Sequence, residues 1–218
     1  MSRGIKFSPG EFYHLYNRGT ERRTVFLSPK EYERFVLLLY IANNASQFHL
    51  PTKVSTQQSL FATPREKTLV DIAAYCLMPN HFHLLIREKE KGGISRFMQK
   101  LMTGYTMYFN AKQERSGVLF QGKFKATHAV GNRYLKYLIA YIHLNPVKLI
   151  EPKWKETGIT HKKRAEHYLI KYRYSSYPDH IGQERPENNV IEPRALLEYD
   201  TPHDFKASIL EWLSYKDG

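Results

Sequence analysis

Two strand-like runs joined by Pro79-Asn80 constrain this chain more than any other feature. The runs are LVDIAAYCLM (69–78) and HFHLLIREKE (81–90), and both are rich in apolar residues. Proline and asparagine are typical turn residues, so the two runs are predicted to be neighbouring strands joined by a turn. A chain with such a pair needs further elements to cover it.

The remaining strands and helices are predicted from turn residues and helix-start residues along the chain. Gly92-Gly93 breaks the chain after the second strand, and Ser28-Pro29 has the form of a helix start, with an N-cap followed by proline at the first helical position. The predicted order is β-α-β-β-α-β-α, which is the ferredoxin-like α+β pattern: an antiparallel sheet with helices on one face. The remaining strands are expected at 11–19 and at 117–130, where the strand bends near Gly122, and the helices at 28–45, 94–115 and 132–144.

The chain divides into two parts. Residues 1–147 are predicted to form the main domain, with an irregular, polar inserted loop near 45–68. Residues 148–218 form a C-terminal extension. This extension begins with a basic patch, HKKRAEHYLIKYRY, and ends with an acidic tail and a predicted helix, DFKASILEWLSYK.

The second strand carries two histidines on one face. Side chains alternate along a strand, so Phe82, Leu84 and Ile86 share the face that fits a core, and His81 and His83 share the other. Two imidazoles that project together from a stiff element suit a divalent metal ion or paired contacts to a phosphate. The alternative is a pair of polar residues on the solvent side of the sheet.

The helix predicted at 132–144 brings a second group of polar residues. Its apolar residues form a stripe suited to pack on the sheet. Tyr141 and Asn145 are four residues apart, close to one helical turn, and fall together at the edge of that stripe. A phenol and an amide beside two imidazoles would make a specific chemical site, whereas the alternative is a boundary tyrosine with a capping asparagine.

Charge points to a polyanionic partner. The chain has a net charge of +12, yet residues 184–218 hold eight acidic and four basic residues, which leaves 29 basic and 13 acidic residues in the first 183. A basic body rich in tyrosine suggests nucleic acid, and the acidic tail is expected to dock on it and limit non-specific binding. The single cysteine, Cys76, and the lack of an apolar signal or of a run near ~20 apolar residues predict a cytoplasmic protein without a membrane partner.

Four motifs in this order carry a resemblance: YCLMPNHFHLLI, GYTMYFN, GVLFQGKFKA and YIHLNPVK. Together with YHLYNRG and YSSYPDHIG they span roughly residues 8–182 and resemble the REP-associated tyrosine transposases of the HUH single-strand transposases and nucleases. The resemblance implies metal-dependent cleavage and transfer of single-stranded DNA at hairpins, through a covalent 5′-phosphotyrosine. It implies Mg²⁺ or Mn²⁺ as cofactor, and a monomer or a homodimer.

Residue by residue, the resemblance assigns Tyr141 as nucleophile, His81 and His83 as catalytic metal ligands, and Asn145 as a third ligand. Tyr105 is the competing nucleophile, but it lies in an apolar helical stripe and is expected to pack in the core. The two other readings are a hairpin-binding module that does not cut, and a metal-dependent phosphoesterase. The residues expected to contact DNA are basic: Arg18, Arg22, Arg23, Lys123, Lys125, Lys136, Lys162, Lys163 and Arg164.

Overall fold

A computed structural model describes residues 5–46, 60–196 and 201–212. Within these residues a four-stranded sheet has the strand order β2-β3-β1-β4, and the neighbouring strands are antiparallel. Helices α1 and α3 connect β1 to β2 and β3 to β4, which is the ferredoxin-like arrangement predicted from the sequence. The bounds are Phe12–Arg18 (β1), Pro29–Ala42 (α1), Val70–Met78 (β2), His81–Glu88 (β3), Gly93–Lys112 (α3) and Lys125–His128 (β4).

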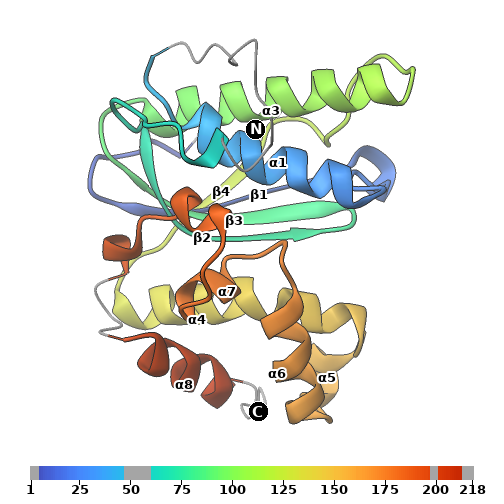
Figure 1. The fold of residues 1–218 in the computed structure, drawn as a ribbon, viewed down its shortest axis with the longest axis vertical. Helices are drawn as coiled ribbons and strands as arrows, with labels where there is room; N and C mark the ends of the chain where they lie inside the picture. Colours follow the sequence, from blue (N-terminus) through green and yellow to red (C-terminus); the bar gives the residue numbers. More distant parts are fainter. Residues whose placement is uncertain (1–4, 47–59, 197–200, 213–218) are drawn as a thin grey trace.

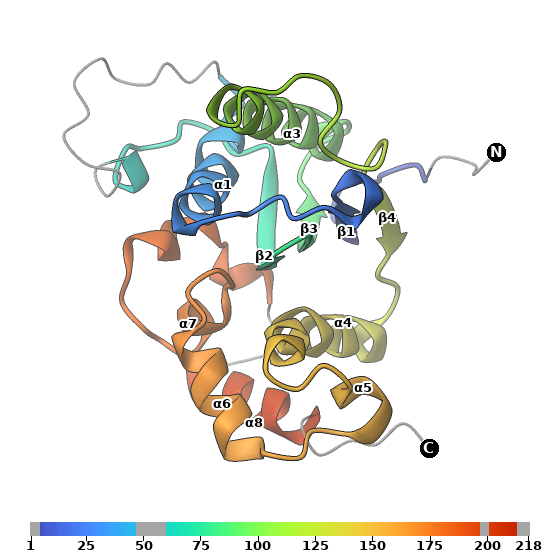
Figure 2. The same ribbon diagram turned by 90° about the vertical axis from the view of Figure 1, so that its right-hand side faces the viewer.

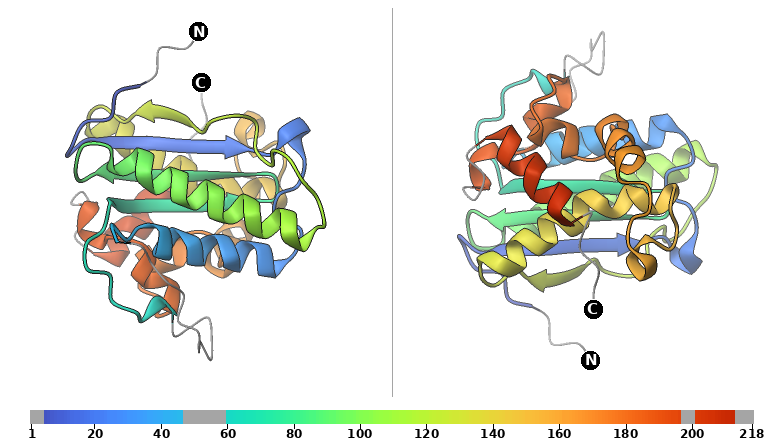
Figure 3. Two further views of the ribbon diagram at one scale, coloured as in Figure 1. Left: turned by 90° about the horizontal axis from the view of Figure 1, so that it is seen from above. Right: turned by 90° about the horizontal axis from the view of Figure 1, so that it is seen from below.

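Helices cover both faces of this sheet, as Figures 1 and 2 show. Helices α1 and α3 lie on one face, as expected. The other face is covered by α4 (Asn132–Leu144) and the C-terminal extension (Figure 3). Every residue of β2 is buried, so its side chains are covered on both faces of the sheet. A cover on one face alone would leave the apolar side chains of the other face in water.

Each face has its own apolar cluster. Phe82, Leu84 and Ile86 of β3 pack with α1 and α3, so the predicted core face is confirmed. On the opposite face Leu85 packs with α4 and with residues of the extension. The sheet therefore separates two cores, and any site beside His81 and His83 belongs to the α4 side.

Local contacts fix the start of both crossover helices. The backbone N–H of Ser28 donates to the Glu31 carboxylate (2.7 Å), which makes the capping box of α1. At the start of α3, a Cβ on Gly93 would lie 2.4 Å from the carbonyl oxygen of Leu69, so only glycine allows this close approach. The predicted helix starts are therefore confirmed.

The fourth strand is shorter than predicted. The sequence suggested a strand over 117–130, but β4 spans only Lys125–His128. Gly122 has a positive φ of 68°, which confirms the predicted bend, and just before it in the chain the N–H of Gln121 still donates to the carbonyl oxygen of Arg18 (2.8 Å). Helix α4 ends at Leu144 as expected, and the chain continues directly into a 3₁₀ helix, Asn145–Leu149.

The extension packs on the sheet through apolar side chains. The helix of the acidic tail is held by apolar side chains, because Phe205 and Ile209 are buried in the cluster against α4. That the tail limits non-specific DNA binding stays a prediction. Its ion pairs include Lys206 with Glu166 at 2.8 Å. The helices of the extension are α5 (Trp154–Thr157), α6 (Lys162–Lys171), α7 (Tyr177–His180) and α8 (Pro202–Trp212), with 3₁₀ helices at Pro186–Val190 and Pro193–Ala195.

The expected inserted loop leaves and rejoins the fold at one point. Asn44 and Thr68 form an antiparallel bridge, and the N–H of Ala45 donates to the carbonyl of Lys67 (2.8 Å). The middle of this loop, residues 47–59, lies outside the described residues. None of the described helices has the length and apolar character needed to cross a membrane.

Candidate functional site

The two histidines of β3 project toward α4. In the sheet His83 lies opposite Tyr16 and His81 lies opposite Arg18, both of β1. Because directly paired residues point to the same face, these four side chains form two adjacent rows on the α4 side. The predicted alternation along β3 is thus confirmed, and His83 is 6% exposed rather than on an open solvent face.

An open cavity of about 490 Å³ lies over these rows. It is bounded by the end of β1, the β2–β3 turn, the loop before β4, and α4 with the 3₁₀ helix that follows. Four basic residues and no acidic residue line it, so its surface favours an anion. The lining residues are Tyr16, Asn17, Arg18, Arg22, Asn80, His81, His83, Gln121, Lys125, Tyr141 and Lys148.

Tyr141 enters this cavity from α4. Its ring centroid lies 5.5 Å from that of His83 and 6.0 Å from that of His14, in both cases nearly edge to face. The side chain is half-buried, and burial raises the pKa of its phenol. The structure therefore brings Tyr141, His81 and His83 to one place, although more than fifty residues separate the tyrosine from the histidines.

His14 is a site residue that sequence reasoning missed. Its Nε2 lies 2.9 Å from Nδ1 of His83, and both imidazoles are buried. On the neighbouring ring, Nδ1 of His81 lies 2.6 Å from Oδ1 of Asn80. The available signal was the alternation of His14, Tyr16 and Arg18 on one face of a strand, as at His81 and His83.

These contacts engage Nδ1 of both β3 histidines, which leaves Nε2 of each as the ring nitrogen that can bind a metal ion. A histidine that ligates a metal commonly donates its other ring N–H to a neighbour, which fixes the tautomer and the ring orientation. Asn80 and His14 occupy that position for His81 and His83, respectively. The donor chemistry thus fits a divalent metal ion held by two imidazole Nε2 atoms.

The imidazoles are also held in their neutral form. Burial lowers the pKa of His81 to about 4, with smaller contributions from Lys148, Lys155 and Arg18. Burial, followed by His14 and His81, lowers the pKa of His83 well below its usual value. Neutral imidazole is the form that binds a metal, so protons do not compete for these ligands at neutral pH.

Asn145 is less directly placed than the resemblance implies for a metal ligand. Its side chain is 3% exposed, and Nδ2 donates to the carbonyl oxygen of Tyr141 (2.7 Å). It does not line the cavity. Among the described residues no cluster of three or more His, Cys, Asp or Glu side chains is arranged to hold a metal, and the role of Asn145 as third ligand stays a prediction.

The basic residues expected to contact DNA divide into two groups. Arg18, Arg22 and Lys125 line the cavity. Two further lysines were not predicted: Lys148 lines the cavity, and Nζ of Lys155 lies 4.0 Å from the ring centroid of Tyr141. The other predicted residues lie outside the cavity lining; these are Arg23, Lys123, Lys136, Lys162, Lys163 and Arg164.

Tyr105 lies across the sheet from this cavity. It is 0% exposed in the α1–α3 cluster, and its hydroxyl donates to the carbonyl oxygen of Val25. Burial raises the pKa of its phenol. The prediction that Tyr105 packs in the core is confirmed, and the sheet lies between its hydroxyl and the cavity over the β3 histidines.

Comparisons with known proteins bear on the family and the fold of this chain. A family model described as "Transposase IS200 like" matches residues 13–145, well over half of the chain. A solved structure of a REP-associated tyrosine transposase bound to a REP hairpin is similar in fold: the TM-score is 0.53 at 12% identity, over 86% of this chain and 90% of that one. No curated protein matches the chain.

Proposed function

Since the chain belongs to the IS200-like transposase family, we propose that it is a metal-dependent endonuclease and strand transferase for single-stranded DNA at hairpins. The hairpin is inferred from the REP hairpin bound by the structurally similar transposase. One observation carries the proposal: Tyr141, His81 and His83 line the same basic cavity. The family match alone would be equally compatible with a chain that has lost its site.

The proposed reaction is phosphoryl transfer to Tyr141. Its phenolic oxygen forms a bond to the scissile phosphorus, and the bond from phosphorus to the 3′ oxygen breaks. The departing strand takes up a proton and leaves as a 3′ hydroxyl, while the 5′ phosphate stays on the tyrosine. Because the phosphotyrosine retains the energy of the cleaved bond, a 3′ hydroxyl can later reverse the step without ATP.

The histidines of β3 supply the proposed metal site. His81 and His83 would hold Mg²⁺ or Mn²⁺ through Nε2, and Mn²⁺ is the easier to reconcile with imidazole ligands. The bound ion would act as a Lewis acid on the phosphate and as a template for its orientation. The remaining coordination positions suit oxygen ligands, among which we propose the amide oxygen of Asn145.

Basic side chains of the chain itself would bind the DNA phosphates in the cavity. Arg18, Arg22, Lys125 and Lys148 line it and would neutralise the phosphates on either side of the scissile bond. Arginine in particular matches phosphate oxygens with paired N–H groups. These contacts position the strand without reading its bases.

Tyr141 must lose its proton to attack, and burial opposes this by raising the pKa of the phenol. A nearby cation has the opposite effect, because it favours phenolate. Lys155 supplies such a charge 4.0 Å from the ring centroid. We therefore propose that Lys155, together with the metal, favours the phenolate, and we assign no side chain as a general base.

The test uses labelled hairpin DNA with a single-stranded flank and Mn²⁺ or Mg²⁺, followed by denaturing gels. Wild type should form an adduct that survives denaturant, and Tyr141→Phe should bind the hairpin but form none. Excess EDTA should stop the reaction. Binding without an adduct from any hairpin would favour a module that does not cut, and cleavage without an adduct would favour a metal-dependent hydrolase.

A further inference from the structure

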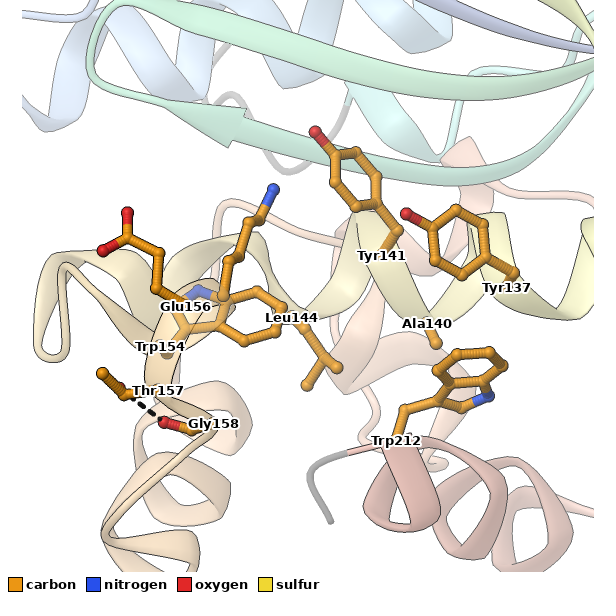
Figure 4. Close-up of a pocket in the computed structure, with 10 residues that line it drawn as sticks. Tyr137, Ala140, Tyr141, Leu144, Trp154, Glu156, Thr157, Gly158 and Trp212 are labelled. Atoms are coloured by element: carbon orange, nitrogen blue, oxygen red, sulfur yellow. Dashed lines mark hydrogen bonds between the residues drawn. The ribbon is translucent and has the colours of Figure 1, made fainter. Parts of the chain in front are cut away.

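Tyr141 lines a second cavity on its other side, away from the sheet. This cavity has a volume of about 290 Å³ and lies between α4, α5 and α8 (Figure 4). It is not part of the metal site. The lining residues are Tyr137, Ala140, Tyr141, Leu144, Trp154, Lys155, Glu156, Thr157, Gly158 and Trp212.

Four of the ten residues that line this second cavity are aromatic. Trp154 of α5 lies on one side and Trp212 of α8 on the other, with Leu144 of α4 between them (Figure 4). The ring of Tyr137 meets Trp212 at a centroid distance of 5.5 Å and stacks with Tyr141 at 6.1 Å. Flat apolar surfaces therefore continue from the second cavity to the proposed nucleophile.

One cation of the second cavity lies against Tyr141, the residue that lines both cavities. Nζ of Lys155 lies 4.0 Å from the ring centroid of Tyr141 and 5.6 Å from that of Trp154. Burial and the neighbouring Lys148 lower the pKa of Lys155. An anion next to Tyr141 would relieve the repulsion between these two lysines.

A nucleotide matches this pair of cavities. Its phosphate is anionic and suits the basic cavity over His81 and His83, whereas its base is flat and suits an aromatic slot. Stacking on aromatic side chains is the usual way in which proteins hold unpaired bases. A volume of about 290 Å³ lies at the small end of ligand sites, which suits one base rather than a folded hairpin.

We propose that the second cavity binds the base of one unpaired nucleotide that adjoins the scissile phosphate. The inference rests on the proposed function, because that function places the scissile phosphate beside Tyr141. It adds a position at which an extruded base is held between Trp154 and Trp212, so that the backbone passes Tyr141. The same aromatic walls would otherwise serve only to pack α5 and α8 against α4.

Intrinsic fluorescence tests this without any cleavage. The chain has two tryptophans, and both line the second cavity. The Tyr141→Phe variant, which cannot form the adduct, is titrated with hairpin DNA carrying a single-stranded flank, and hairpin binding is followed separately by anisotropy. A bound base should quench tryptophan emission in parallel with binding, and a blunt hairpin without a flank should bind with less quenching.

Single abasic sites placed along the flank identify the nucleotide. At one position the abasic site should weaken binding about 5- to 140-fold, the equivalent of about 1–3 kcal/mol for one stacked base. Trp154→Ala should cause a similar loss with intact DNA and no further loss with that abasic DNA, whereas Trp154→Phe should bind nearly normally. Tyr108→Ala, which removes a half-buried ring on α3 across the sheet, serves as the control.

The outcomes separate the two proposals. Quenching and coupling to Trp154 without any adduct from wild type would support the base site and count against the catalytic proposal. Tight hairpin binding with unchanged tryptophan emission, and with independent losses from Trp154→Ala and every abasic site, would overturn the base site. Circular dichroism and melting of each variant would show whether a loss reflects unfolding, and in that case Trp154→Phe with the abasic series decides.

Discussion

Replacing His14 should weaken metal binding although His14 itself is not assigned as a ligand. Metal binding through Nε2 of His83 requires the proton on Nδ1, and His14 Nε2 is the acceptor 2.9 Å away. His14→Phe keeps a ring that can stack on Tyr16, 5.1 Å away in the wild type, but it removes the acceptor. We expect about 10- to 100-fold weaker metal affinity, the usual effect of losing such a partner.

The magnitude agrees with the hydrogen bond that is lost. Both rings are 6% exposed, so water cannot readily replace the missing acceptor. A buried donor without a partner costs about 1–3 kcal/mol, and a tenfold change in affinity is about 1.4 kcal/mol. The cost of the unpaired donor and the expected 10- to 100-fold loss of metal affinity are therefore effects of the same size.

The assay is titration of the DNA-free protein with Mn²⁺, followed by electron paramagnetic resonance of the free ion. His14→Gln offers an amide oxygen as a replacement acceptor and should recover part of the affinity. His203→Ala, which removes a histidine whose side chain is 90% exposed, is the matched control. If His14→Phe binds Mn²⁺ within twofold of wild type, the positioning role is refuted.

Other predictions follow from the same site. His83→Ala should abolish metal-dependent cleavage on gels while hairpin affinity changes little, since lysine and arginine carry that affinity; full activity would contradict the metal assignment. Tyr105→Phe should retain adduct formation. It should lose roughly 1 kcal/mol of stability in urea, because the Tyr105 hydroxyl donates to a buried carbonyl. An adduct that maps to Tyr105 would contradict the choice of Tyr141 as nucleophile. Lys148→Gln should weaken hairpin binding equally for all sequences and reduce the salt slope by about 0.7–0.9; a sequence-dependent loss would argue against a phosphate contact. Burial lowers the pKa of His14 from 6.5 to about 4, so the unfolded chain binds more protons in that range and stability falls from pH 7 to pH 5. Because burial also lowers the pKa of His81, His83, His143 and His180, the measurement is urea unfolding at both pH values for wild type and His14→Phe: the variant should lose less stability, and an equal loss would mean that His14 is accessible to water.

Much of the fold could be read from local patterns. The alternation of Phe82, Leu84 and Ile86 with the two histidines depends only on the two-residue repeat of a strand, and the structure confirms it. The start of α1 depends on Ser28, Pro29 and nearby residues alone. Such features are local, because backbone geometry and capping act over a few residues.

The length of β4 and the cover on the second face were harder to predict. A strand over 117–130 with a bend near Gly122 was predicted, and the bend is confirmed, yet the regular ladder with β1 begins only at Lys125. Docking of the acidic tail was predicted from its charge alone, and the structure adds that Phe205 and Ile209 anchor its helix in an apolar core. In both cases tertiary packing decided what the local pattern left open.

By itself, the sequence determined the order of elements, the shared face of the β3 histidines, the core position of Tyr105 and the motifs that identify the family. Only the tertiary structure decided that His14 contacts His83, that Lys155 lies over the ring of Tyr141, and that Trp154 and Trp212 line one cavity. The physical reason is distance along the chain. Strand register and helix packing bring these residues together through the burial of two apolar clusters, and no local repeat in the sequence encodes which distant side chains will meet.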